Sequence, residues 1–133
     1  MIGLDTNVLV RYFAQDEPKQ AAAARRLLQT RLTRESPGHV NVVTMTETVW
    51  VLKRLYAAGR SELVHVVENL LAAPNIVVER RASVRKALQL FNASSTVGFA
   101  DCLIAQLNLD AGCTQTVTFD RAAAKVIGFE LVA

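Results

Sequence analysis

Short apolar runs alternate along the chain with longer stretches in which apolar residues recur every three or four positions. The short runs are residues 1–5, 40–43, 76–78, 117–119 and 129–132. Runs of this length between turn residues are typical of buried strands. Strands that alternate with helical stretches favour an α/β fold, so we predict such a fold with a mainly parallel sheet.

Seven stretches are predicted to be helical. They cover approximately residues 7–13, 16–32, 45–57, 61–73, 84–91, 99–111 and 121–126. Asp16 is expected to cap the second helix, with Pro18 in its first turn. Thr44 and Glu47 match a capping box, in which Thr44 caps the third helix and Glu47 reaches back to it. The apolar stripe of the fourth helix and the face of Trp50 on the third are each either core or dimer surface.

The composition is that of one globular domain. The chain has 133 residues, of which 51% are hydrophobic and 20% are charged, and it contains no internal repeat or linker. A chain of this length can bury an ordinary core without disulfides. We therefore predict a single domain that spans residues 1–133.

The sequence predicts a cytoplasmic protein. No uninterrupted apolar stretch reaches the 18 or so residues that a membrane span needs. The N-terminus carries Asp5 and no leading basic residue, which is a poor match to a signal peptide. Cys102 lies in an apolar helical run and is expected to be a reduced core residue. The net charge of +3 permits a nucleic-acid partner but does not require one.

Asp5, Glu47 and Asp120 occupy positions that suit either a helix cap or a functional site. Asp5 ends the first predicted strand and Asp120 ends the fourth. The carboxyl ends of parallel strands are where α/β proteins bind ligands. An Asp between a strand and a helix is equally a favoured N-cap, and Glu47 fits the capping box. Both interpretations stay open for each residue taken alone.

Asp101 is harder to explain as a structural residue. Its neighbours in Phe99-Ala-Asp-Cys-Leu-Ile-Ala are all apolar, so its helix is predicted to be hydrophobic nearly all round and buried. An Asp is almost never buried without a partner, because its charge is expensive to desolvate. No Lys or Arg lies nearby in the sequence. A metal ion or a polar cleft would account for the residue.

If the four acids meet at the carboxyl edge of the sheet, they require a cation. Two carboxylates about 5 Å apart repel by roughly 3 kcal/mol at an effective dielectric constant near 20. Oxygen-only ligands suit Mg²⁺ or Mn²⁺. Such ions, held by acidic side chains, commonly hydrolyse phosphodiesters, because the metal activates water and stabilises charge on the phosphate.

Four segments of the chain resemble the motif blocks of PIN domains in order and spacing. They are MIGLDTNVLVRYF, TETVWVL, GFADCLIA and VTFDRAAAKV. The resemblance is closest to the VapC toxins of bacterial toxin–antitoxin pairs and spans nearly the whole chain. It implies a three-layer α/β/α sandwich, metal-dependent endoribonuclease activity, a homodimer, and inhibition by a cognate antitoxin protein.

The resemblance also implies roles for individual residues. Asp5 and Asp101 match the firmest ligands of Mg²⁺ or Mn²⁺, and Glu47 and Asp120 complete the set directly or through water. Asn7 and Thr118 match the polar residues that orient these carboxylates. The chain departs from the family after Asp120, where Ala122-Ala-Ala-Lys replaces a run that often includes an aromatic residue. This departure predicts weaker packing of the last helix.

Other polar and aromatic residues have two interpretations each. Arg11 and Arg121 either hold RNA phosphates near the metal or face solvent. Trp50 and Tyr56 are spaced as core or interface residues, with base stacking as the alternative.

Two other functions fit parts of the sequence. A PIN domain that binds RNA or protein without turnover would have an intact fold, but the presence of all four acids argues against it. A phosphoacceptor receiver domain also has clustered acids, but it needs a Lys at the end of a strand, and Lys125 lies in a predicted helix.

Overall fold

The computed structural model describes residues 1–126 and 129–132, which belong to two compact units. The N-terminal unit is Met1–Arg81 and the C-terminal unit is Ala82–Ala133. Every described strand pair is parallel, and helices alternate with the strands along the chain. The predicted α/β fold with a mainly parallel sheet is therefore confirmed.

Three short strands form the sheet of the N-terminal unit. They are β1 (Ile2–Gly3), β2 (Gly38–Val40) and β3 (Ile76–Val78), with β2 in the centre. The register places Ile2 opposite Gly38 and Gly38 opposite Ile76. A Cβ atom at Gly38 would lie 2.8 Å from Leu32 Cδ1 and 2.9 Å from Leu4 Cδ1. A larger residue at the start of the buried central strand would therefore require the Leu4 and Leu32 side chains to shift.

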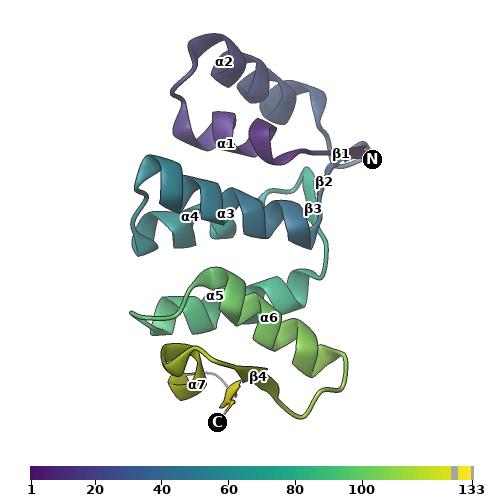
Figure 1. The fold of residues 1–133 in the computed structure, drawn as a ribbon. Helices are drawn as coiled ribbons and strands as arrows, with labels where there is room; N and C mark the ends of the chain where they lie inside the picture. Colours follow the sequence, from purple (N-terminus) through teal and green to yellow (C-terminus); the bar gives the residue numbers. More distant parts are fainter. Residues whose placement is uncertain (127–128, 133) are drawn as a thin grey trace. The chain divides into compact units, whose positions relative to one another are not determined.

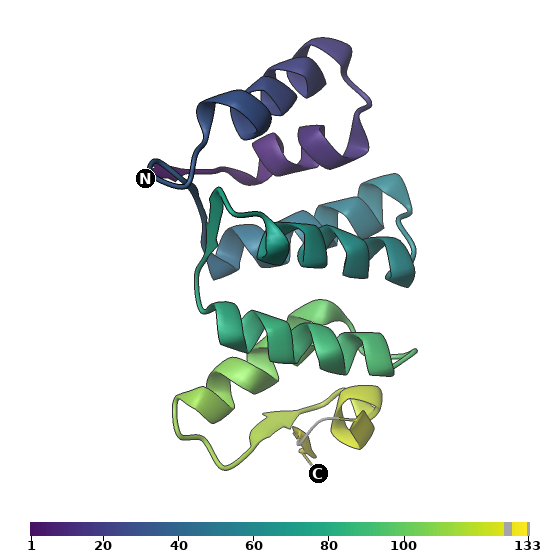
Figure 2. The ribbon, with the colours of Figure 1, turned by 180° about the vertical axis from the view of Figure 1, so that it is seen from behind.

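Five helical segments alternate with these strands along the N-terminal unit. They are α1 (Thr6–Ala14), α2 (Pro18–Arg26), the π-helical segment η1 (Leu27–Arg31), α3 (Val42–Tyr56) and α4 (Arg60–Ala72). Within the N-terminal unit α1 lies beside α2, and α3 lies beside α4, as both views show (Figures 1 and 2). Each βα connection is short, so each helix begins close to the carboxyl end of the preceding strand.

The predicted start of α3 is wrong. The second strand lies at 38–40 instead of 40–43, and the helix begins at Val42 instead of Met45. The cap is Asn41, whose side-chain oxygen accepts the Thr44 N–H at 2.8 Å, so Thr44 is not the cap. Val42 and Val43 have β-branched side chains typical of strands, but the Asn41 cap places them in the first helical turn.

The predicted cap of α2 is also wrong. Glu17 is the N-cap and accepts the Gln20 N–H at 2.6 Å, whereas Asp16 bonds to side chains of other helices. Pro18 does occupy the first turn, as predicted. The predicted helix to residue 32 changes at Leu27 into η1, which is a wider turn than an α-helix.

The core of the N-terminal unit lies between the sheet and the helices. Its fully buried side chains include Leu9, Val40, Met45, Leu63 and Leu70. Each such side chain contributes about 1.5–3 kcal/mol by leaving water. The stripe of α4 is therefore core, whereas Trp50 on α3 is 55% exposed and faces outward.

The described part of the C-terminal unit contains three helices and a two-stranded parallel sheet. The elements are α5 (Arg81–Ala93), α6 (Phe99–Asp110), β4 (Thr116–Thr118), α7 (Arg121–Val126) and β5 (Phe129–Leu131). The rings of Phe91 and Phe99 meet edge to face at 5.9 Å and join α5 to α6. Ala123 is buried in a small cluster with Ala105 and Phe129. The small side chain of Ala123, and no aromatic residue of α7 itself, therefore makes this contact.

The prediction that α6 is buried all round is wrong in part. Cys102 and Leu103 are buried, as expected of core residues, but Ile104 is 47% exposed and Leu109 is 55% exposed. One face of this apolar helix is therefore open in the structure. Among the described residues, no helix combines the length and hydropathy required to cross a membrane.

Candidate active site

Asp5 directly follows β1 and is the N-cap of α1. Its Oδ1 accepts the N–H of Thr6 at 2.8 Å, and its main-chain oxygen accepts the N–H of Val8 at 3.1 Å. A capping side chain usually accepts from the second or third residue of the helix. Asp5 instead bonds to the adjacent N–H, and its second carboxylate oxygen lies outside this bond. Capping therefore occupies only part of this exposed carboxylate.

Glu47 lies in the second turn of α3 and accepts a hydrogen bond from the Thr6 hydroxyl. Thr6 is only 5% exposed, whereas Glu47 is exposed. The predicted role of Glu47 in a capping box is wrong, because Asn41 caps this helix. Thr6 therefore connects two of the predicted site acids, since its N–H bonds to Asp5 and its hydroxyl bonds to Glu47.

Asp101 lies in the first turn of α6 and is half-buried. The helix is predicted to be buried, but the side chains of its first turn lie at its open end. Burial raises the pKa of the Asp101 carboxyl, and the negative charge of Asp120 raises it further. Within the described part of the C-terminal unit, no donor forms a hydrogen bond or ion pair with the Asp101 side chain. Its charge is therefore poorly compensated.

Asp120 lies between β4 and α7 and acts as a cap through one of its oxygens. Its Oδ1 accepts the N–H of Ala122 at 2.9 Å and that of Ala123 at 3.2 Å. The Thr118 hydroxyl accepts the Asp120 N–H at 3.0 Å. The capping interpretation is therefore correct for Oδ1, while Oδ2 lies outside these bonds and the carboxylate still acts on Asp101.

The four acids thus form two pairs, one in each unit. Asp5 and Glu47 both accept hydrogen bonds from Thr6. Asp101 and Asp120 are close enough for the charge of Asp120 to raise the pKa of Asp101. Within the residues that the structure describes, no group of three or more His, Cys, Asp or Glu side chains has the geometry of a metal site. A pair of carboxylates nevertheless fits Mg²⁺, which is usually held by one or two carboxylates with waters and substrate phosphates.

A comparison with protein families decides the class of the chain. The family model described as the PIN domain matches residues 2–128. The chain belongs to the PIN domain family. PIN domains are typically nucleases and generally use divalent metal ions. A comparison with curated proteins finds no match.

Sequence reasoning missed two polar residues of this PIN domain. The bond of Thr6 to Glu47 could not be predicted, because the two residues are 41 positions apart in sequence. Glu79 directly follows β3, and its Oε1 accepts the first helical N–H of α3, that of Val42, at 2.9 Å. The rule that ligands gather at the carboxyl ends of parallel strands could have identified Glu79, since it applies equally to Asp5.

The remaining candidate residues differ in their surroundings. Asn7 is exposed on α1, two residues after Asp5, and Arg121 is exposed at the start of α7. Arg11 is not a free surface residue, because it bonds to Asp16, Gln20 and Tyr56. Trp50 is not core, and it stacks on no other ring among the described residues. Arg54 lies over it at 5.8 Å from the ring centroid.

Proposed function

We propose that this PIN domain is a Mg²⁺- or Mn²⁺-dependent endoribonuclease. The observation that carries the proposal is the pair of Asp101 and Asp120, in which an uncompensated, half-buried carboxylate lies in the field of a second one. Such a pair is unfavourable for a metal-free protein and favourable for a protein that binds a divalent cation. Hydrolysis of a phosphodiester is the reaction that this donor set and the family both support.

In this proposal Asp5 and Asp101 are the firmest metal ligands, and Glu47 and Asp120 complete the set. When bound, the metal supplies an activated water and stabilises negative charge on the phosphate. The Thr6 hydroxyl holds the Glu47 carboxylate, and the Thr118 hydroxyl holds the main chain of Asp120. Asn7, beside Asp5 on α1, orients the first carboxylate.

The test is cleavage of a mixed RNA pool by the purified chain, with Mg²⁺ or with EDTA. We expect cleavage that needs Mg²⁺ and is lost in Asp5→Asn. Glu35→Gln is the control, since Glu35 is an exposed acid of the same unit in the loop between η1 and β2. Cleavage that persists in EDTA, or in Asp5→Asn with Mg²⁺, would contradict the proposal.

A second experiment tests whether both pairs act on one ion. Mg²⁺ at 100 times its dissociation constant should stabilise the folded chain by about 2.7 kcal/mol. If one site needs all four acids, Asp5→Asn and Asp101→Asn each remove this stabilisation, and the double variant shows no further loss. Independent, additive losses would instead indicate two separate sites.

The finer identity that we propose is a VapC-type toxin in the cytoplasm, paired with a cognate antitoxin protein. The support is the resemblance of the four motif blocks around the acids to those of VapC toxins. Co-expression offers a direct test. The wild-type chain should arrest growth, Asp101→Asn should not, and the protein encoded beside it should restore growth.

We further propose that the chain acts as one domain and forms a homodimer through the outer face of α3. Val43 and Trp50, seven residues apart on one side of this helix, are 71% and 55% exposed and place two large apolar side chains on the same face. Trp50→Glu should therefore shift the mass measured by light scattering from two chains to one. The same change at Ala72, which is exposed on α4, is the control. A wild-type chain that is monomeric at high concentration would refute this interface.

A catalytically silent PIN domain that binds RNA or protein is the alternative. It predicts RNA binding without cleavage and no stabilisation by Mg²⁺. The two experiments above distinguish it from the nuclease, because the nuclease needs both responses.

A further inference from the structure

A pocket of about 430 Å³ lies in the N-terminal unit, between α1 and the segment formed by α2 and η1. This volume is within the range of small-molecule sites, which is roughly 300–1,000 Å³. Its polar lining includes Asn7, Arg11 and Gln20, and its apolar lining includes Val8, Ala24 and Leu27. We call it the α1–α2 pocket.

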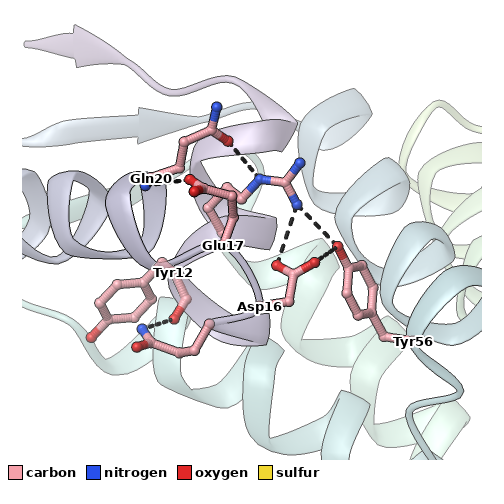
Figure 3. Close-up of polar contacts among 7 residues, drawn as sticks. Tyr12, Asp16, Glu17, Gln20 and Tyr56 are labelled. Carbon is pink, nitrogen blue, oxygen red and sulfur yellow. Dashed lines mark hydrogen bonds and ion pairs between the residues drawn. The ribbon is translucent and has the colours of Figure 1, made fainter.

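The Arg11 guanidinium beside this pocket is held in a fixed orientation. Its Nε donates to Gln20 Oε1 at 2.6 Å, and its Nη1 donates to Asp16 Oδ1 at 3.3 Å and to the Tyr56 hydroxyl at 3.0 Å. The Tyr56 hydroxyl donates in turn to Asp16 Oδ2 at 2.7 Å. The dashed lines of Figure 3 mark these bonds among residues of α1, α2, α3 and the loop before α2. The two N–H groups on Nη2 lie outside this network.

The same bonds fix the orientation of the Gln20 amide. The Nε–H of Arg11 can only donate, so the Gln20 oxygen must face it and the amide NH₂ must point elsewhere. Figure 3 shows the Gln20 nitrogen directed away from the guanidinium. The Arg11 Nη2 group and the Gln20 NH₂ group therefore offer donors to a ligand that brings acceptors.

We propose that the α1–α2 pocket binds a guanine base of the RNA substrate. The O6 and N7 atoms of guanine are adjacent acceptors. The Arg11 Nη2 group and the Gln20 NH₂ group are the two donors for them. The flat ring would lie on Val8, Ala24 and Leu27. Adenine and cytosine present an amino donor on the corresponding edge. A bare phosphate could accept the same bonds, but it would have to shed water against the apolar lining.

The position of the pocket suits a nucleotide next to the scissile phosphate. Asp5 caps α1, and Asn7 and Arg11 lie on it, so the rise along the helix axis from Asp5 to Arg11 is about 9 Å. This inference rests on the proposed function only in taking RNA as the ligand. RNA-binding proteins read unpaired bases in this manner, by stacking and by bonds to their edges.

Binding of short oligonucleotides in EDTA tests the pocket without relying on cleavage. The probes are fluorescein-labelled oligoadenylate heptamers whose central base is guanine, hypoxanthine, adenine or 7-deazaguanine. We expect guanine and hypoxanthine to bind about tenfold tighter than adenine and 7-deazaguanine, which lack O6 and N7 respectively. Fluorescence anisotropy gives the four dissociation constants.

Two variants of equal charge separate the pocket from a general electrostatic effect. Gln20→Glu keeps the acceptor for Arg11 Nε but replaces the free NH₂ by an oxygen, so it should abolish the preference for guanine. Gln29→Glu, on the exposed side of η1 and outside the pocket lining, should retain it. Equal binding of all four probes, or a preference that survives Gln20→Glu, would overturn the proposal. A guanine preference in a chain that cleaves no RNA would uphold it while the nuclease proposal failed.

Discussion

The Thr6 hydroxyl donates a hydrogen bond to the Glu47 carboxylate, and this bond joins the first turn of α1 to the second turn of α3. Thr6 is buried and its N–H also bonds to Asp5, so one residue contacts the acid that follows β1 and an acid of α3. This arrangement makes Thr6 a positioning residue, whose contribution should appear in metal affinity more than in stability.

Thr6→Val should weaken Mg²⁺ binding and Mg²⁺-dependent cleavage by about 10- to 100-fold, because loss of a bond to a metal ligand has costs of this size. Thr6→Ser should restore both, since it keeps the hydroxyl. Thr46→Val is the control, because its hydroxyl donates to the main-chain oxygen of Val42 and not to an acid. Isothermal titration with Mg²⁺ measures the affinity, and an unchanged value in Thr6→Val would contradict the role.

Asp101→Asn should raise the melting temperature in EDTA at pH 7 by about 1–3 °C, while it abolishes Mg²⁺-dependent cleavage. The raised pKa of Asp101 means that its charged form is unfavourable in the folded state, and the amide removes that charge. Asp110→Asn on the same helix should lower the melting temperature. The Asp110 carboxylate accepts bonds from Ser83 and from Gln106, and an amide offers one acceptor oxygen in place of two. A fall in both variants would indicate that Asp101 is a structural residue.

Thr48→Val should stabilise the chain by about 1 kcal/mol, because burial of an unpaired hydroxyl is unfavourable. Thr48 is fully buried on α3, and its hydroxyl has no hydrogen-bond partner among residues 1–126 and 129–132. The Val side chain has nearly the same shape. Urea unfolding measures the change, and Thr48→Ser should show a loss instead, because it keeps the hydroxyl and removes the methyl group.

Asp16 should make the chain more sensitive to acid. The Tyr56 hydroxyl, followed by Arg11, lowers the pKa of Asp16 below its usual 3.8 in the folded state. The stability that this carboxylate contributes is therefore present above pH 3.8 and is lost as the pH falls through the lower folded value. Urea unfolding gives the free energy of unfolding at each pH. Tyr56→Phe should reduce the decrease in this free energy between pH 5 and pH 3. Tyr12→Phe, whose hydroxyl is not part of this network, should leave the fall unchanged.

The sequence predicted the fold class because strand-sized and helix-sized apolar patterns differ over many residues. It predicted boundaries less well, because they depend on single caps. Val40 to Val43 has the composition of a strand, yet Asn41 ends the strand and starts α3. Asp16 and Glu17 are both good caps by type, and only the distant partners of Asp16 explain why Glu17 is used.

The sequence predicts the site acids because each lies at a strand end, at a helix start or among apolar neighbours. Asp101 is the clearest case, since its neighbours are apolar and no cation is near. The connections between the acids could not be predicted. The bond from Thr6 to Glu47 and the fixed orientation of Arg11 depend on tertiary packing, which brings together residues 41 and 45 positions apart.

The exposure of Trp50 has a spectroscopic consequence. It is the only tryptophan of the chain, and it lies in the N-terminal unit. Of the two free cysteines, Cys102 is buried, whereas Cys113 in the C-terminal unit is exposed. A thiol-reactive dye should therefore attach selectively at Cys113 and accept fluorescence energy from Trp50. The unmutated protein thus contains a donor and an acceptor position for following, in solution, how magnesium or RNA changes the distance between its two units.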